Sequence, residues 1–373
     1  MEKLFVIILL LAGLTSSNAQ NKKDESVPET SINVYTKIEL KSLIGISDSL
    51  WENKIYTCEK PGVVTCFDTT GNVVWRHSMS SEIVTGPLVT DGQIAIGTAN
   101  GEIISIISHT GEQIQSLGID DSITTDLTAM QYEGDKELFL PKQSSSKTAI
   151  LFGTSSGIIY CLDLETLQEY WRNNDSRGKI IHPPLVIQNK VLFASSDGYL
   201  YSIDARNGLL NWRWKETEAT DFSETKIICD GEKVFAVAKD SQLYCIDLLL
   251  GKLIWESGKI KVLPPIALSI DKKNLYVKSD DKRFLIFSAE KGIVTRQLKR
   301  SDPFDSLRTQ PISYKDKIYY TNNGSIFALD KKFKEEKIFN FGESDIITFQ
   351  QLSNDKFLAA TSSGTILIFG IRQ

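Results

Sequence analysis

Residues 198–212 read Gly-Tyr-Leu-Tyr-Ser-Ile-Asp-Ala-Arg-Asn-Gly-Leu-Leu-Asn-Trp, and this phrase decides the fold. It runs from a glycine through alternating apolar residues to Asp204, Gly208 and Trp212. A period of two residues is typical of a β-strand, and the same alternation precedes the phrase at 191–194. Since Ser-Asp-Gly at 196–198 tolerates positive φ angles, we expect a tight turn between two antiparallel strands.

The phrase recurs eight times along the chain. The copies begin at Gly62, Gly101, Gly157, Gly198, Ser241, Lys282, Gly324 and Gly364. Successive copies lie 39, 56, 41, 43, 41, 42 and 40 residues apart, a spacing typical of the four-stranded blades of a β-propeller. The longest separation indicates an insertion at 120–148, which is either a specificity loop or a disordered hairpin tip. No helical periodicity of useful length interrupts the pattern, so the sequence predicts an all-β protein with eight blades.

We expect the two ends of the repeat region to make up one complete blade together. The last unit has candidate strands at 347–352, 356–361 and 365–371, and the chain then stops without an outer strand. A spare alternating segment at 31–40 precedes the first unit. We expect this N-terminal strand to close the ring, because closure removes the exposed edges of an open sheet. Residues 31–373 then form one eight-bladed domain of four-stranded antiparallel blades.

The spacing Asp-x-x-x-Gly-x-x-x-Trp resembles the tryptophan-docking repeat of the pyrroloquinoline-quinone (PQQ) propeller superfamily, over about residues 31–371. In that superfamily the tryptophan of one blade packs against the next blade, and a large buried ring also needs a partner for its N–H. The resemblance implies a structural, blade-docking role for Trp75, Trp171, Trp212, Trp255, Asp68, Asp163, Asp204, Asp247, Gly208 and Gly251. Gln115, Arg296 and Ile338 replace the tryptophan in degenerate units, where we expect looser junctions.

The N-terminus reads as a secretory signal peptide at 1–19. An apolar run at 4–14 is followed by Ser17-Asn18-Ala19, with small residues three and one positions before the expected cleavage after Ala19. Residues 20–30 are expected to be a disordered mature N-terminus. An eleven-residue apolar run is too short to span a bilayer, although a membrane anchor is the alternative interpretation. No cysteine follows the run, so we expect no lipobox, and the mature chain has no candidate transmembrane segment. The protein is expected to be exported, periplasmic or secreted.

Composition excludes several classes of site. The chain carries 42 basic and 47 acidic residues with no dense basic run, which excludes nucleic acid as an expected partner. Three scattered histidines and five cysteines fit no zinc spacing, so we expect no metal site. Cys66, Cys161 and Cys245 each stand four residues after the start of their unit and are expected to be buried thiols. Whether Cys58 pairs with Cys66 stays open.

The superfamily has two relevant branches, which imply opposite functions. Quinoprotein dehydrogenases hold PQQ and Ca²⁺ at the channel mouth and use an adjacent cysteine pair, and no two cysteines are adjacent here. The sequence also contains no nucleophile elbow, zinc-protease motif or P-loop. We therefore expect no catalytic residues, no cofactor and no enzyme activity. The resemblance to the outer-membrane assembly branch, BamB, implies a non-catalytic binding scaffold.

That branch implies a monomer with a protein partner in the cell envelope, such as the β-barrel assembly machinery. The variable outer-to-inner strand connections are the expected binding surface. Within them, Arg177, His182 and Arg308 are the candidate partner-binding residues near the channel rim. The alternatives are a propeller that binds a glycan or small molecule at the channel mouth and, less favoured, a PQQ-dependent dehydrogenase.

Overall fold

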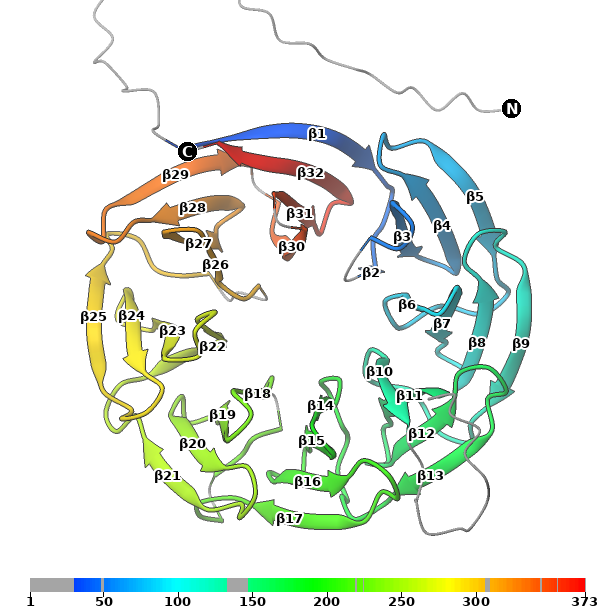
Figure 1. Cartoon of the computed structure of the whole chain (residues 1–373), viewed down its shortest axis with the longest axis horizontal. Coiled ribbons are helices and arrows are strands. Elements are labelled where there is room, and N and C mark those ends of the chain that lie inside the picture. The colour runs from blue at the N-terminus through cyan, green and yellow to red at the C-terminus, as the bar shows by residue number, and fades with distance from the viewer. Residues whose placement is uncertain are drawn as a thin grey trace, which may run out of the picture.

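The computed structural model describes residues 30–47, 50–132, 147–218, 220–223, 225–305, 309–342, 344–353 and 355–372. These residues form eight antiparallel sheets of four strands, arranged in a ring as the blades of a β-propeller (Figure 1). The predicted all-β class and the predicted eight blades are confirmed. The expected signal peptide, the segment 20–29 and residues 133–146 of the 120–148 insertion lie outside the described residues.

Each blade is numbered in chain order, and its strands run from the innermost to the outermost. Blade 1 contains β2 (Gly45–Ile46), β3 (Lys54–Glu59), β4 (Val63–Asp68) and β5 (Val73–Ser78), and blade 2 contains β6 (Leu88–Thr90), β7 (Gln93–Gly97), β8 (Glu102–Ile107) and β9 (Gln113–Gly118). Blade 3 contains β10 (Thr128–Tyr132), β11 (Lys147–Gly153), β12 (Ile159–Asp163) and β13 (Glu169–Asn173), and blade 4 contains β14 (Leu185–Ile187), β15 (Lys190–Ala194), β16 (Leu200–Asp204) and β17 (Leu210–Trp214).

The second half of the ring repeats this order. Blade 5 contains β18 (Ile228–Cys229), β19 (Lys233–Val237), β20 (Leu243–Asp247) and β21 (Leu253–Glu256), and blade 6 contains β22 (Val262–Leu268), β23 (Asn274–Ser279), β24 (Arg283–Ser288) and β25 (Val294–Lys299). Blade 7 contains β26 (Ile312–Tyr314), β27 (Lys317–Asn322), β28 (Ser325–Leu329) and β29 (Glu335–Asn340), and blade 8 contains β30 (Ile346–Ser353), β31 (Lys356–Thr361), β32 (Thr365–Arg372) and β1 (Ser31–Glu39).

Blade 8 joins the two ends of the chain. Its outer strand is β1, which pairs with β32 in a register that runs from Ser31 opposite Arg372 to Glu39 opposite Thr365. The predicted closure of the ring by the N-terminal strand is therefore confirmed. Ring closure leaves no blade with an open flank, because the last blade completes its sheet with the first strand of the chain.

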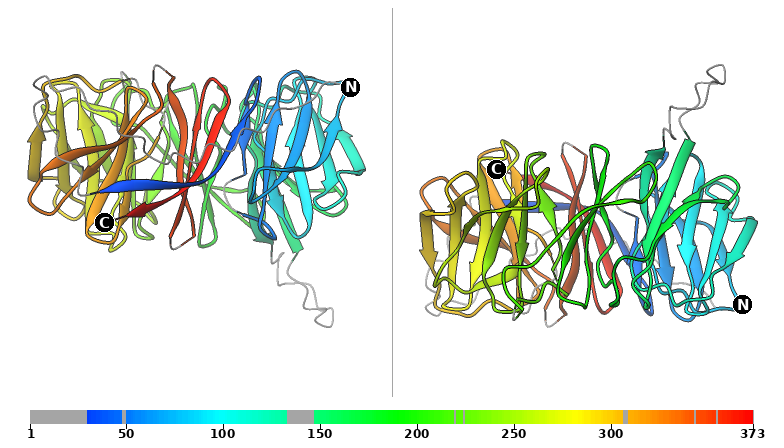
Figure 2. Two further views of the ribbon diagram at one scale, coloured as in Figure 1. Left: turned by 90° about the horizontal axis from the view of Figure 1, so that it is seen from above. Right: turned by 90° about the horizontal axis from the view of Figure 1, so that it is seen from below.

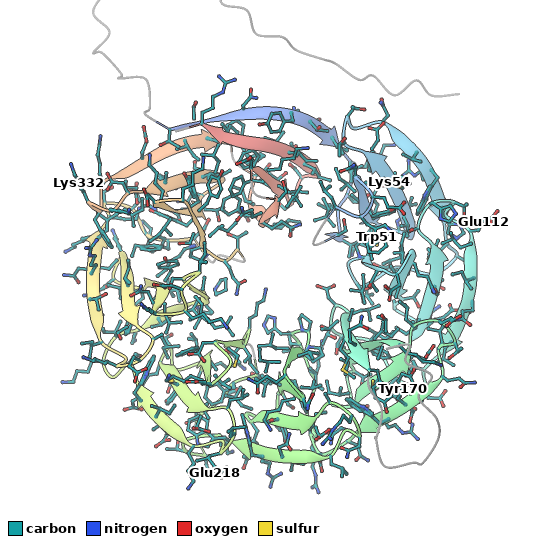
Figure 3. The ribbon with its side chains drawn as sticks, in the orientation of Figure 1. Trp51, Lys54, Glu112, Tyr170, Glu218 and Lys332 are labelled. Carbon is teal, nitrogen blue, oxygen red and sulfur yellow. The ribbon has the colours of Figure 1, made fainter. Side chains whose placement is uncertain are left out.

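The strands differ in burial from the inside of each blade to its rim. Third strands such as β16 are almost wholly buried, because neighbouring blades cover both of their faces. Outer strands alternate in exposure, and charged side chains such as Glu112, Glu218 and Lys332 point away from the ring (Figure 3). The hydrophobic core is therefore divided into clusters that each fill the space between adjacent blades.

The ring is a thick disc with two faces (Figure 2). The connection face carries the links from the outer strand of one blade to the inner strand of the next, together with the turns between second and third strands. The turn face carries the turns between first and second strands and between third and fourth strands. These assignments follow from the antiparallel order of each sheet.

Candidate functional site

Four tryptophans connect neighbouring blades through one repeated hydrogen bond. The Nε1–H of Trp75 donates to Ser108 O at 2.9 Å, and that of Trp171 donates to Ala205 O at 3.0 Å. Trp212 and Trp255 donate in the same way, to Leu248 O at 3.0 Å and to Ala289 O at 3.2 Å. Each acceptor lies in the turn between the third and fourth strands of the next blade, so the indole holds two blades in register.

The aspartates of the repeat fold the turns between third and fourth strands, and Trp171 and Trp212 dock onto two of these turns. Asp204 Oδ1 accepts the backbone N–H of Arg206 at 2.8 Å, and Asp247 Oδ1 accepts the N–H groups of Leu249 and Leu250 at 2.9 and 2.7 Å. Asp68 and Asp163 accept turn N–H groups in the same manner. A carboxylate that accepts its own turn's N–H groups satisfies donors that the tight turn would otherwise leave unpaired.

Other residue types make the docking contact where tryptophan is absent. Gln115 Nε2 donates to Glu165 O at 2.5 Å, and Arg296 Nη1 donates to Lys331 O at 2.8 Å. At the ring closure, the Thr36 hydroxyl of β1 donates to Thr69 O. The docking hydrogen bond is therefore kept at Gln115 and Arg296, and looser packing of these junctions stays a prediction. The common requirement is a side-chain donor of suitable reach and not an aromatic ring.

Blade 7 departs from the alignment that places Ile338 at the tryptophan position. Tryptophans stand opposite the fourth residue after the start of their unit, as Trp171 stands opposite Cys161. In blade 7 the equivalent residue is Ala328, and it stands opposite Glu336. Ile338 instead lies at a bulge between two paired positions. The next outer strand is β1, which has no third-to-fourth-strand turn before it, so no turn carbonyl needs a donor here.

The predicted partner-binding residues are only partly brought together. Arg177 and His182 both lie in the link 174–184 between β13 and β14, on the connection face. Arg177 is exposed, and its backbone N–H donates to Asp197 Oδ2 at 3.2 Å, which fixes the link against blade 4. His182 is half-buried and engaged with its surroundings. Arg308 lies outside the described residues.

His182 occupies a position that buried threonines fill in other blades. Thr85 Oγ1 accepts Gly97 N–H at 2.9 Å, Thr125 Oγ1 accepts Gly153 N–H at 2.9 Å, and Thr225 Oγ1 accepts Val237 N–H at 3.0 Å. Isolated β-bridges are formed by Ile83 and Ile123, which stand two residues before Thr85 and Thr125. The equivalent bridge residue Ile180 stands two residues before His182. The sequence interpretation missed these threonines, although Thr85 and Thr225 both stand sixteen residues before the start of their unit.

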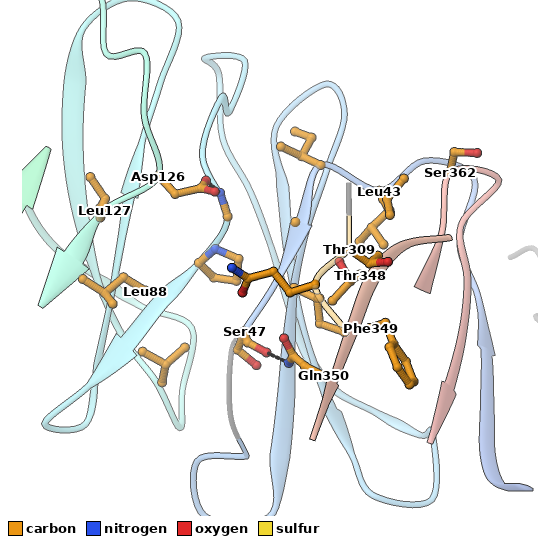
Figure 4. Close-up of a pocket in the computed structure, with 18 of the residues that line it drawn as sticks. Leu43, Ser47, Leu88, Asp126, Leu127, Thr309, Thr348, Phe349, Gln350 and Ser362 are labelled. Atoms are coloured by element: carbon orange, nitrogen blue, oxygen red, sulfur yellow. Dashed lines mark hydrogen bonds between the residues drawn. The ribbon is translucent and has the colours of Figure 1, made fainter. Parts of the chain in front are cut away.

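A cavity of about 650 Å³ lies within the ring on the connection-face side. Its lining comes from blades 1, 2, 3, 5, 7 and 8, at the points where the links enter the inner strands. Figure 4 shows Asp126, Thr309 and Gln350 around it, and Gln350 Nε2 donates to Ser47 O at 3.0 Å. We refer to this cavity as the channel mouth.

The charged groups of the channel mouth have opposite signs. Asp126 Oδ1 accepts Gly86 N–H at 2.7 Å, which fixes the carboxylate at the lining. Lys226 comes from the link before blade 5, and its side chain is exposed. Apolar groups such as Leu127 and Phe349 complete the wall. The mixture of one carboxylate, one ammonium group, amides and apolar surface suits a polar organic ligand or a polypeptide segment.

A second cavity, of about 360 Å³, lies between blades 3 and 4 on the turn face. Its lining includes Met130, Tyr132, Val186 and Arg206. Tyr132 stacks on Tyr170 with ring centroids 3.9 Å apart, and its hydroxyl donates to Arg206 O at 2.9 Å. These contacts fix one wall of the cavity.

Blades 6 and 7 enclose a group of buried charges. Lys278 is 1% exposed, donates to Thr321 O at 3.2 Å, and has its Nζ 5.6 Å from the ring centres of Phe304 and Tyr320. Arg300 lies beside it and faces Glu335, with Nε 3.3 Å from Oε1. Burial lowers the pKa of Lys278 to about 7, against the opposing effect of the Asp305 carboxylate.

Burial also raises the pKa of Asp305, while the N–H of Asn323, which donates to its Oδ2 at 2.5 Å, acts in the opposite direction. Within the described part of the chain, Arg300 Nη1 and Asp305 Oδ1 have no hydrogen-bond partner. This junction therefore holds charges whose burial is only partly compensated.

The five cysteines are free thiols. Cys58, Cys66, Cys161 and Cys245 are buried, and burial raises the pKa of Cys66 to about 11 and that of Cys245 to about 12. A buried thiol with a raised pKa stays protonated and behaves as a small apolar side chain.

The described ranges of the chain lack two kinds of feature. Among these residues, no group of three or more His, Cys, Asp or Glu side chains is placed to hold a metal ion. No helix within them is long and apolar enough to cross a membrane.

The ring of eight blades and the repeated donor-to-turn contact define a PQQ-like β-propeller. A family model described as "Outer membrane protein assembly factor BamB" matches residues 38–118 and 140–337, which is more than half of the chain. The chain therefore belongs to this family.

Individual relatives are distant. The outer membrane protein assembly factor BamB of Kangiella koreensis is 20% identical over 329 residues, which cover 76% of this chain and 83% of that protein. The protein of the same name from Burkholderia pseudomallei is 22% identical over 214 residues, 54% of this chain and 51% of that protein. The chain thus spans about half the length of the Burkholderia relative.

Solved structures share the fold at still lower identity. The crystal structure of BamB from Moraxella catarrhalis superposes with a TM-score of 0.70 at 18% identity, covering 91% of this chain and 97% of that one. Sqt1 from Saccharomyces cerevisiae superposes with a TM-score of 0.73 at 11% identity, covering 92% and 100%. These likenesses establish the architecture alone.

Proposed function

We propose that this chain is a non-catalytic, extracytoplasmic binding scaffold that works as a protein–protein interaction platform in the cell envelope. The observation that carries the proposal is the family match over residues 38–118 and 140–337, whose name is that of an outer membrane assembly factor. On this proposal the chain is exported, cleaved after Ala19, and acts as a monomer. Its partner is a component of the β-barrel assembly machinery.

The connection face is the surface that we assign to the partner. Its links differ in length, from 341–345 between β29 and β30 to 215–227 between β17 and β18. Variation of this kind at fixed strand geometry changes the shape of the face without changing the ring. The link 174–184 presents the exposed Arg177 there, and His182 and Arg308 belong to the same proposed contact.

Site-specific photocrosslinking in the native envelope tests this proposal. A photoreactive residue at Arg177 should capture a β-barrel assembly component, because the side chain is exposed on the connection face. The matched control is a photoreactive residue at Asn189, which is exposed on the turn face. Substitution of Arg177, His182 and Arg308 together should weaken capture from a third position on the same face. Equal capture from both faces, or capture of glycan without protein, would contradict the proposal.

The channel mouth supports a second candidate function, binding of a glycan or small molecule. The observation in its favour is a cavity of about 650 Å³ that contains both Asp126 and Lys226. Soluble envelope oligosaccharides should then raise the unfolding temperature of the wild-type protein. They should not raise that of a variant with Asp126→Asn and Lys226→Met. Dye reduction on addition of PQQ, Ca²⁺ and an alcohol would instead favour an enzyme.

A further inference from the structure

Large hydrophobic side chains that are mostly exposed gather in one part of the molecule. Among the described residues, six are more than half exposed: Tyr35 at 53%, Leu209 at 66%, Leu249 at 68%, Leu250 at 64%, Ile270 at 77% and Ile293 at 56%. Tyr35 lies on β1 at the ring closure. The other five all lie on turns of blades 4, 5 and 6, and we call these five residues the aliphatic patch.

All five residues of the aliphatic patch lie on the turn face. Leu209 immediately precedes β17, Leu249 and Leu250 lie in the turn between β20 and β21, and Ile270 and Ile293 lie in the two turns of blade 6. The positions that correspond to Leu249 and Leu250 in other blades carry polar residues, namely Thr69 and Thr70, His109 and Thr110, Glu165 and Thr166, and Lys331 and Lys332. The aliphatic character is therefore not required by the repeat.

The docking contacts bring turns of the patch beside the neighbouring blades. Trp212 of blade 4 donates to Leu248 O, so the turn that bears Leu249 and Leu250 lies beside the outer strand of blade 4. Trp255 of blade 5 donates to Ala289 O, so the turn that bears Ile293 lies beside the outer strand of blade 5. The tips therefore lie on adjacent blades of a single face of the disc.

Backbone N–H groups at three of the tips are hydrogen-bonded within the protein, so these tips can enter an apolar phase without unpaired donors. Asp247 Oδ1 accepts the N–H groups of Leu249 and Leu250 at 2.9 and 2.7 Å, and Asn207 Oδ1 accepts the N–H of Leu209 at 3.1 Å. Unpaired backbone groups strongly oppose transfer into an apolar medium. Internal pairing removes that obstacle for these three N–H groups.

The charges around the patch suit the border between hydrocarbon and lipid headgroups. Lys252, Lys272 and Lys291 each stand two residues from an aliphatic tip, and their stems can cover apolar surface while the ammonium stays hydrated. Glu232 and Glu290 flank Lys233 at 3.9 and 3.3 Å. Because both signs are present, we expect apolar insertion to dominate over attraction to anionic lipid.

We propose that the aliphatic patch inserts into the interfacial layer of a lipid bilayer and holds the turn face against the membrane. The five tips protrude from one face of a disc and line neither of the two cavities described above, which favours a flat apolar phase over a partner side chain. Thr30, the first residue that the structure describes, also lies at this face, where it contacts Lys317. The connection face is left free for a partner.

Vesicle sedimentation tests the proposal directly. The probe is phosphatidylethanolamine vesicles with a minor fraction of phosphatidylglycerol, and the protein is the chain from Gln20 onward, with the full chain measured beside it. The variant Leu249→Ser, Leu250→Ser and Ile293→Ser should lower the partition coefficient by about tenfold or more, and high salt should change it little. The matched control is Val73→Ser with Val74→Ser, which removes aliphatic side chains that are 47% and 46% exposed on blade 1.

The outcomes separate this inference from the proposed function. Unchanged partition in the patch variant, or an equal loss in the control, overturns the inference. Binding by the full chain alone assigns membrane contact to residues 1–19 and also overturns it. A wild-type dimer that the patch variant converts to monomer, without vesicle binding, would make the patch an interface between copies. None of these results bears on crosslinking at Arg177, and circular dichroism checks that each variant is folded.

Discussion

The junction between blades 3 and 4 and the junction between blades 6 and 7 share one geometry and differ in chemistry. At the first, Trp171 is buried among apolar residues, and its Nε1–H donates to Ala205 O at 3.0 Å. At the second, the exposed Arg296 takes the same position, donates to Lys331 O at 2.8 Å, and stacks 5.6 Å over the ring of Phe333. The space beneath holds Lys278 and Arg300 beside an apolar cluster that includes Phe284 and Tyr320.

The comparison shows which contact the two blade junctions share and which contacts are particular to each. Both junctions keep a donor to the turn carbonyl, so the hydrogen bond sets the register of adjacent blades. Only at the first junction is the donor itself a large buried ring, which contributes burial of apolar surface. In the second, aromatic faces of Tyr320 and Phe327 surround cations, and this attraction offsets part of the cost of removing charge from water.

Of the changes that test this comparison, removal of the Trp171 ring should have the largest effect on the free energy of unfolding. We expect Trp171→Ala to lower the free energy of unfolding by about 3 to 5 kcal/mol, because it leaves a cavity between blades 3 and 4. Urea unfolding followed by circular dichroism measures the change. Trp171→Phe is the control, since it keeps most of the ring and loses only the donor, for about 1 kcal/mol. A loss at Trp171→Phe as large as that at Trp171→Ala would mean that the hydrogen bond dominates.

Crowding of the same indole should have the next largest effect. Gly208 has a φ of +73°, and a Cβ there would lie 2.6 Å from Trp171 Cε3. We expect Gly208→Ala to cost about 2 to 3 kcal/mol, from left-handed strain together with steric overlap. Gly92→Ala is matched in backbone, with a φ of +74° and nothing within 4 Å of the added Cβ, and should cost about 1 kcal/mol. Equal costs in urea unfolding would show that the contact with Trp171 is loose.

The repeat explains why most of the fold could be predicted from the sequence. The period of two residues and the glycine at each turn are local signals, and repetition multiplies them. The number of blades and the closure of the ring by the segment 31–40 could therefore be predicted, and the closing strand is observed at Ser31–Glu39. Ile338 shows the limit of this reasoning. Its spacing matched the tryptophan position, but a displaced bulge in β29 changes the register, and bulge position depends on cross-strand contacts that spacing does not contain.

The candidate site was less predictable because its contacts join residues far apart in the chain. Arg177 and His182 could be placed on the connection face, but the cavity that combines Asp126 with Lys226 required the ring to be closed. The charged group of blades 6 and 7 was also missed. Lys278 lies inside an alternating run, Leu275 to Ser279, where a lysine suggests an exposed position, yet its side chain is buried.

The pH dependence of stability should distinguish the charged junction from the apolar one. Between the lowered pKa of Lys278, about 7, and its ordinary value, the unfolded chain binds more protons than the folded chain. The free energy of unfolding should therefore rise with pH from about pH 7 to 9, by about 1 to 2 kcal/mol from this residue. Lys278→Met should remove that rise, whereas Lys273→Met, at an exposed lysine of the same blade, should leave it. An unchanged pH profile in Lys278→Met would contradict the assignment of the rise to this amine.

The smallest effect should come from Arg296, the donor that takes the tryptophan position at the charged junction. Since its side chain is exposed, Arg296→Ala removes a hydrogen bond and a cation–π contact with little loss of apolar burial, for about 1 kcal/mol or less. Arg296→Gln should restore most of the loss, because Gln115 makes the equivalent bond to Glu165 O in blade 2. Urea unfolding of the two variants provides the test. A cost at Arg296→Ala comparable to that of Trp171→Ala would show that the turn contact, and not ring burial, provides the stability of both junctions.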